Sequence, residues 1–221
     1  RLLAINLYSY VVNPYTRDAY FDFDLFKKHV ALAQRIMDDI IDLELEKIEK
    51  IIAKIDSDPE SEEVKEAEKH LWEKIYKKSG QGRRTGVGIT AEGDMLAAMG
   101  LRYGTEEATE FLNKYIKQSL WKPIVHLLTW QKNVEHSLSM TVNEKKNNPF
   151  INRLKEADPE LYEEMKKYGR RNIACLTIAP TGTTSLMTQT TSGIEPVFMP
   201  VYKRRRKRSI ESISDTRRFC R

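Results

Sequence analysis

Hydrophobic and polar positions follow two different periods along the chain, and each period predicts a kind of element. Residues 2–12 and 173–179 are short apolar runs, which predicts strands, the second of them buried on both faces. From Phe26 to Ile41, apolar residues recur every three or four positions, which predicts an amphipathic helix with Asp22 or Asp24 as N-cap. Alternating strands and helices indicate a helix-rich α/β protein whose few strands would not close a sheet by themselves.

Residues 44–79 carry a second helical pattern. Two apolar stripes are separated by the sequence DSDPESEE, in which Asp58 is the expected N-cap and Pro59 the first helical residue. The pattern predicts an antiparallel helical hairpin. We interpret it as a structural insertion on the surface, with a partner-binding arm as the alternative.

The remaining helices are predicted from capping and breaking residues. They are a short helix ending at Gly100 or Gly104, a long one from Thr105 to about Gln118, one beginning at Pro123, and one with Asp158 as N-cap and Pro159 as first residue.

Composition narrows the class of protein. Of 221 residues, 40% are hydrophobic and 31% are charged, and no run of about 18 uncharged apolar residues occurs, so a membrane span is not expected. Cys175 and Cys220 are the only cysteines and no His/Cys cluster has metal spacing, so we expect neither a disulfide framework nor a metal site, and a cytoplasmic location. The first residue is Arg1 and opens an apolar strand pattern, so we expect the chain to begin in the middle of a larger protein.

The net charge of +5 is concentrated near the C-terminus, in YKRRRKR (202–208) and RRFCR (217–221). A basic run is typical of nucleic-acid binding. One alternative is therefore a non-enzymatic nucleic-acid-binding α/β protein that uses residues 203–208.

Candidate chemistry is concentrated in the sequence LTIAPTGTTS, at residues 176–185, where an apolar strand pattern ends in small and hydroxylated residues. Hydroxyl and amide groups can surround a phosphate without carrying charge, and a helix starting near Ser185 would add partial positive charge. The lysine of a Walker A loop is missing, which disfavours a kinase or an ATPase. Composition alone is also compatible with an ordinary loop.

Three segments carry a resemblance to a known family. LTIAPTGTTSLMTQTTSGIEPVFMPVYKRR resembles the phosphate-binding segment of ribonucleotide reductase large subunits, and is most similar to the adenosylcobalamin-dependent class II enzymes. RRTGVGITAEGDML and RLLAINLYSYV resemble two further segments of that family, in the same order. The resemblance covers the chain except for residues 44–79.

The resemblance implies a partial ten-stranded α/β barrel of the ribonucleotide reductase type with an inserted helical hairpin. Residues 1–221 would be the C-terminal part of the catalytic barrel domain, and residues 44–79 the insertion. The implied activity is an oxidoreductase that replaces the ribose 2′-OH with hydrogen by thiyl-radical chemistry, with a disulfide as acceptor, in deoxyribonucleotide synthesis for DNA replication. The family's finger-loop pattern Asn-x-Cys-x-Glu is absent from the sequence, so we expect those residues upstream and this portion alone to be inactive.

The resemblance also implies a site and partners. Adenosylcobalamin would serve the full-length protein, with a ribonucleoside di- or triphosphate as substrate and a thioredoxin-like protein or small thiol as reductant. The remainder of the barrel would lie upstream, no membrane is expected, nucleic acid is disfavoured, and a homodimer is left open. No catalytic residue is assigned within the chain. The residues expected to bind substrate phosphates are Pro180, Thr181, Gly182, Thr183, Thr184 and Ser185.

Overall fold

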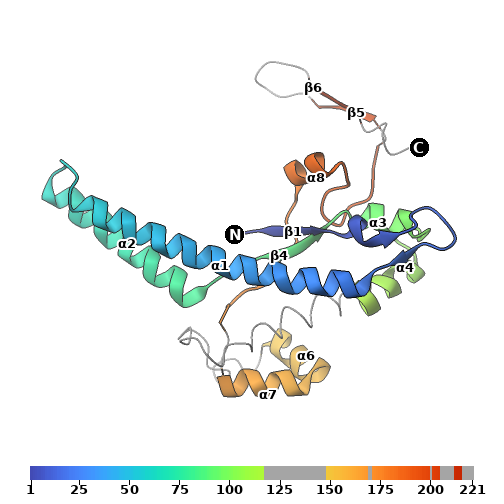
Figure 1. Ribbon diagram of the computed structural model, residues 1–221, viewed down its shortest axis with the longest axis horizontal. Coiled ribbons are helices and arrows are strands. Elements are labelled where there is room, and N and C mark those ends of the chain that lie inside the picture. Colours follow the sequence, from blue (N-terminus) through green and yellow to red (C-terminus); the bar gives the residue numbers. More distant parts are fainter. Residues whose placement is uncertain (117–147, 169–170, 200, 205–211, 216–221) are drawn as a thin grey trace.

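The computed structural model describes residues 1–116, 148–168, 171–199, 201–204 and 212–215 (Figure 1). Two parallel strands, β1 (Leu3–Asn6) and β4 (Val87–Thr90), form its centre, paired in register from Leu3 beside Val87 to Asn6 beside Thr90. The two strands therefore end at the same edge.

The segment 173–177 runs along the other side of β4. The Val87 amide donates to the Cys175 carbonyl and the Thr177 amide donates to the Val87 carbonyl, at 2.8 and 3.2 Å. The pairing is parallel but amounts to one isolated bridge, between Val87 and Leu176. Three segments distant in sequence thus run in one direction.

Two strand predictions need correction. The strand expected over residues 2–12 ends at Asn6, because the Asn6 side chain accepts a hydrogen bond from the Tyr8 amide and starts a 3-10 helix, Leu7–Tyr10. The chain resumes as β2 (Val11–Val12), which pairs antiparallel with β3 (Tyr20–Phe21).

The segment 173–179 was expected to be buried on both faces, and this is wrong for the described residues. Cys175 is buried, but Leu176 and Ile178 are 41% and 54% exposed, because only one face of the segment packs against the described core.

The long helix α1 (Phe23–Ile55) packs against β1 and β4. Asp22 caps it, as predicted, because its Oδ1 accepts from the Leu25 amide at 2.9 Å. The side chains of Phe26, Val30 and Ile41 are fully buried. The helix continues without a break to Ile55, so residue 44, where the hairpin pattern was taken to begin, is not an element boundary.

The second half of α1 and the helix α2 (Glu62–Gly82) form the predicted antiparallel hairpin, which projects away from the strands in Figure 1. The Tyr76 hydroxyl donates to Glu49 at 2.7 Å across it. The prediction that Asp58 and Pro59 start the second helix is wrong: Ser61 is the N-cap, and Asp58 instead pairs with Lys54 of α1 at 2.8 Å. That the hairpin is an insertion stays a prediction.

The short helices that follow β4 begin and end largely at the predicted residues. Helix α3 (Glu92–Ala98) stops before Gly100, whose φ of 74° favours glycine. Thr105 caps α4 (Glu106–Phe111), which passes into a π-helix, Leu112–Ile116. The predicted end at Gln118 and the helix predicted from Pro123 lie outside the described residues.

The remaining described elements complete the chain. Asp158 caps α7 as predicted, because its Oδ1 accepts from the Leu161 amide at 3.1 Å. These elements are α6 (Pro149–Ala157), α7 (Pro159–Tyr168), α8 (Gly182–Thr188), β5 (Val201–Arg204) and β6 (Ser212–Asp215). Within the described ranges, no helix is both long and apolar enough to cross a membrane.

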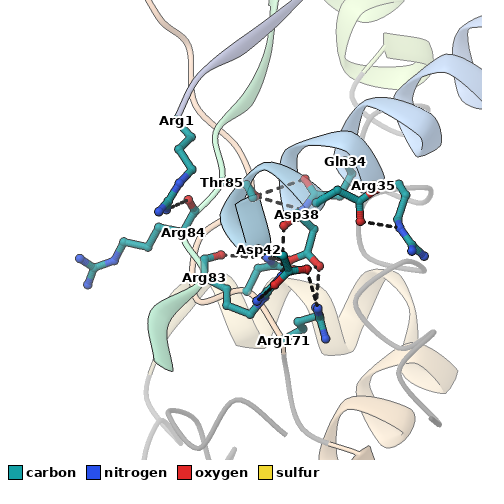
Figure 2. A network of polar contacts seen from close by, with 11 residues as sticks. Arg1, Gln34, Arg35, Asp38, Asp42, Arg83, Arg84, Thr85 and Arg171 are labelled. Atoms are coloured by element: carbon teal, nitrogen blue, oxygen red, sulfur yellow. Dashed lines mark hydrogen bonds and ion pairs between the residues drawn. The ribbon is translucent and has the colours of Figure 1, made fainter. Parts of the chain in front are cut away.

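A buried ion network fixes the starts of the central segments (Figure 2). Asp38, on α1, accepts from Arg83 Nε at 3.0 Å, from Arg171 Nε at 2.6 Å and from Asn172 Nδ2 at 2.8 Å. Arg83 also donates to Asp42 at 2.6 Å. Burial by itself would raise the pKa of Asp38, but the hydrogen bonds from Arg83 and Asn172 and the charges of Arg83 and Arg171 hold that pKa below its usual value. The network joins α1 to the residues that precede β4 and to those that precede the segment 173–177.

Candidate functional site

Two glycines allow β4 and α3 to approach the segment 173–196 closely, while β1 pairs with the other side of β4. A methyl group added at Gly88 would overlap the carbonyl oxygen of Thr177, and one added at Gly93 would lie 2.7 Å from Pro196 Cα. The three segments that carry the family resemblance are therefore packed on one another.

The hydroxyl-rich loop lies at this edge, directly after the segment 173–177. Its helix, α8, begins at Gly182, three residues earlier than the predicted start near Ser185. Thr181 is the N-cap residue and adopts a left-handed conformation, with φ 50° and ψ 23°. The Ser185 amide donates to the Thr181 carbonyl at 2.8 Å. The amides of Gly182, Thr183 and Thr184 precede this first intrahelical bond, so they have no acceptor within the helix.

The hydroxyls of the loop differ in their surroundings. Thr183 and Thr184 are exposed, whereas Ser185 is buried and its hydroxyl donates to the Gly182 carbonyl at 3.0 Å. Apart from its chain neighbours and the backbone of its own helix, no atom lies within 4 Å of where a Gly182 Cβ would be, so this position is open to an approaching group.

The Thr181 hydroxyl faces β4. It lies 2.9 Å from the hydroxyl of Thr90, the last residue of β4, and accepts from the Gly193 amide at 2.7 Å. Thr90 is fully buried, donates to the Thr191 carbonyl at 3.2 Å and also lies 3.1 Å from the Gly193 amide. The end of β4 is thereby joined to both the loop 180–185 and the segment 191–196.

Two carboxyl groups of α3 lie beside these contacts. Asp94 accepts from the Thr191 amide at 2.7 Å; burial raises the pKa of Asp94, and this hydrogen bond partly offsets the rise. Burial raises the pKa of Glu92 to about 7. The Glu92 amide donates to the Gly193 carbonyl at 3.4 Å. This edge therefore combines neutral hydroxyls with two buried carboxyl groups whose pKa values are raised by burial.

The loop 180–185 remains the predicted site, and the sequence did not indicate its neighbours Thr90, Asp94 and Thr191. An isolated Thr at a strand end gives no signal, although the close Gly86–Gly88 spacing in RRTGVGIT indicated that another backbone would approach β4. Cys175 is a buried core residue, as predicted, and Cys220 lies outside the described residues. In the part of the chain that the structure describes, no group of three or more His, Cys, Asp or Glu side chains could hold a metal ion.

These features define an α/β protein with a candidate anion site at the shared end of its parallel segments. The chain belongs to the family described as "Ribonucleotide reductase, barrel domain", whose family model matches residues 1–217. The matched region therefore includes the hydroxyl-rich loop and the three parallel segments.

Curated relatives agree with the family. The chain is 28% identical over 204 residues to a vitamin B12-dependent ribonucleoside-diphosphate reductase of Thermoplasma acidophilum, covering 91% of this chain and 20% of the relative. It is 25% identical over 203 residues to a protein of the same description from Mycobacterium tuberculosis strain CDC 1551, covering 91% of this chain and 23% of the relative. The chain thus spans about a fifth of the length of the relatives it matches.

The same matches bear on two sequence predictions. They favour the reductase family over the nucleic-acid-binding alternative, whose basic run lies mostly in residues 205–208, outside the described ranges. The family match supports a barrel-domain portion, and the described residues show a helix-rich α/β arrangement without a closed barrel.

Proposed function

We propose that this chain is the phosphate-binding portion of the catalytic barrel of an adenosylcobalamin-dependent ribonucleotide reductase. The observation that carries the proposal is the loop 180–185, which places uncharged donors at the shared end of three parallel segments. Ligands of open α/β sheets bind outside the carboxyl ends of the strands. The relatives are ribonucleoside-diphosphate reductases, which favours a ribonucleoside diphosphate over a triphosphate as substrate.

The loop would bind substrate phosphates mainly through its backbone. The free amides of Gly182, Thr183 and Thr184 point along the start of α8, where the partial positive charge of the helix favours an anion. The exposed hydroxyls of Thr183 and Thr184 can donate to phosphate oxygens. In the proposed site Pro180 sets the turn, while Thr181 and Ser185 support the loop through the bonds described above.

The radical chemistry belongs to other parts of the protein. When bound, adenosylcobalamin would supply the radical that forms the reactive thiyl group. Cys175 packs in the core and its thiol donates to the Asn172 carbonyl at 3.9 Å, so we assign it a structural role. The proposal therefore places the finger loop, the redox cysteines and the other strands of a ten-stranded barrel outside this chain.

The remaining elements of the proposal follow the family. The reductant would be a thioredoxin-like protein or a small thiol, the location cytoplasmic, and a homodimer is compatible with the arrangement. We expect the isolated portion to be inactive.

Steady-state kinetics of the full-length protein test the proposal. Wild-type protein should reduce a ribonucleoside diphosphate only when adenosylcobalamin and a dithiol are both present. Thr183→Glu should raise KM for the nucleotide at least about tenfold, because it places a negative charge beside the phosphates. A fold defect would not explain this result, since an acidic residue in the first turn of a helix is stabilising.

The matched control is Thr109→Glu, which places the same charge on an exposed position of α4 and should leave KM unchanged. Absence of cofactor-dependent reduction by the wild type would contradict the proposed activity. An unchanged KM in Thr183→Glu would contradict the phosphate site alone.

A further inference from the structure

We infer that Thr90 is the positioning residue that holds the phosphate loop in its binding conformation, through the hydroxyl of Thr181. The inference rests on the proposed function, because it concerns the same loop. Thr90 does not belong to the loop and, being fully buried at the end of β4, it would not itself touch a phosphate.

The hydrogen bonds among these residues fix the direction of donation. The Thr90 hydroxyl has one proton, and the carbonyl of Thr191 at 3.2 Å can only accept it. The Thr181 hydroxyl then donates its own proton to Thr90 across 2.9 Å and accepts from the Gly193 amide at 2.7 Å. The result is a continuous chain of hydrogen bonds that starts at the Gly193 amide, passes through the hydroxyls of Thr181 and Thr90, and ends at the Thr191 carbonyl.

This chain of hydrogen bonds explains why the backbone of Thr181 adopts a left-handed conformation. A β-branched residue rarely adopts a positive φ, and persists there only when its surroundings hold it. Thr181 has a φ of 50°, and its side chain is held by hydrogen bonds to Thr90 at the end of β4 and to Gly193. Thr181 is also the N-cap residue of α8, so its conformation sets the direction in which the amides of Gly182, Thr183 and Thr184 point.

The same chain has a consequence for binding. Because the single proton of the Thr181 hydroxyl is committed to Thr90, that hydroxyl is not a donor to the phosphate. Its contribution to substrate binding is then indirect and depends on Thr90.

The test is a comparison of Thr90→Val, which removes the hydroxyl and keeps the shape, with Thr90→Ser, which keeps the hydroxyl. In the full-length protein we expect Thr90→Val to raise KM for a ribonucleoside diphosphate about tenfold with kcat changed less than about threefold, because it removes the hydroxyl that bonds Thr181, Thr191 and Gly193. Thr90→Ser should restore KM to within about twofold of wild type.

A matched control separates positioning from general destabilisation. Thr85→Val removes another buried hydroxyl next to β4, one that bonds Gln34 at 3.0 Å at the opposite end of the strand, and it should leave KM unchanged. An equal rise in KM for Thr85→Val, or no rise for Thr90→Val, would overturn the inference.

A double-mutant cycle keeps the inference testable if Thr90→Val folds poorly. Thr181→Val removes the chain of hydrogen bonds from its other end at a half-buried position and should raise KM by a similar factor. In Thr90→Val, the added Thr181→Val change should have little further effect, because the hydrogen bond between Thr181 and Thr90 is already lost. If the two substitutions instead raised KM independently, so that the factors multiplied in the double variant, the inference would be contradicted. A wild type that fails to bind the nucleotide would instead refute the proposed function, so the two failures are distinguishable.

Discussion

The two ends of the central parallel segments are held by different chemistry. At the end where β4 begins, charged side chains dominate: Asp38 and Asp42 of α1 pair with Arg83 and Arg171 in a largely buried network (Figure 2). At the end where β4 finishes, neutral hydroxyls and amides around Thr90 make the connections. The charged end satisfies its own charges, whereas the neutral end leaves helix amides free, which suits an anionic ligand.

The largest predicted effect is at the charged end. Asp38→Asn should destabilise the fold by about 3–5 kcal/mol, because it leaves Arg83 and Arg171 near the core with only the half-exposed carboxylate of Asp42. Denaturant unfolding would measure the loss. The matched control is Asp39→Asn, the next residue, which is half-exposed and pairs with Arg35 at 3.0 Å on the surface, and it should cost less than about 1 kcal/mol.

The pH dependence of the Asp38 effect has a defined sign. The folded-state pKa of Asp38 is depressed, so its contribution is fully present above the unfolded pKa of 3.8 and is lost as pH falls through the lower folded value. The stability difference between wild type and Asp38→Asn should therefore narrow only in strong acid. A difference that vanishes by pH 6 would contradict the buried pair.

A smaller effect of opposite sign is predicted at the neutral end. Burial raises the pKa of Glu92 from 4.5 to about 7, so ionised Glu92 weakens the fold as pH rises from about 4.5 through 7. Glu92→Gln should thus raise stability at pH 8 by about 1–3 kcal/mol and have little effect near pH 4.5. Thermal unfolding at both pH values checks this. A gain of equal size at both would rule out titration of Glu92 as the cause.

The smallest stability effect is expected in the loop itself. Gly182→Ala should change stability by less than about 0.5 kcal/mol, or raise it slightly, because the added methyl group meets no neighbour within 4 Å. The same substitution at Gly88, where the methyl group would overlap Thr177, should destabilise by at least about 2 kcal/mol. Calorimetry of the two variants would show whether the loop is as open as the geometry indicates.

Local signals predicted the helices well. Thr105 and Asp158 are the predicted N-caps and Asp22 is one of the two candidates for α1, because a capping side chain bonds an amide only two or three residues away. The predicted start of α2 was wrong. Asp58, the expected cap, instead forms an ion pair with Lys54 of α1, a contact that a helix pattern does not reveal. The full length of α1 was not predicted, because the composition changes at residue 44 and such a change resembles the boundary between two helices.

The proposed site, like the helices, was visible in the sequence only where its signal is local. The loop 180–185 has a local signature of small and hydroxylated residues, so it could be found from sequence. Thr90 contacts Thr181 of this loop, and Asp94 contacts the neighbouring Thr191, both from about 90 residues away along the chain and only once the segments pack. Side-chain burial in the segment 173–179 was likewise overestimated, because an apolar run does not say which neighbours cover each face.

The most direct measurement of the central claim is the affinity of the full-length protein for a ribonucleoside diphosphate and for the same nucleoside without phosphates. Isothermal titration of wild type and Gly182→Ala would give both values. We predict that the wild type binds the diphosphate at least about tenfold more tightly than the nucleoside, and that Gly182→Ala loses most of this difference while keeping its stability. Equal phosphate discrimination by the two proteins would contradict the claim that this loop binds the substrate phosphates.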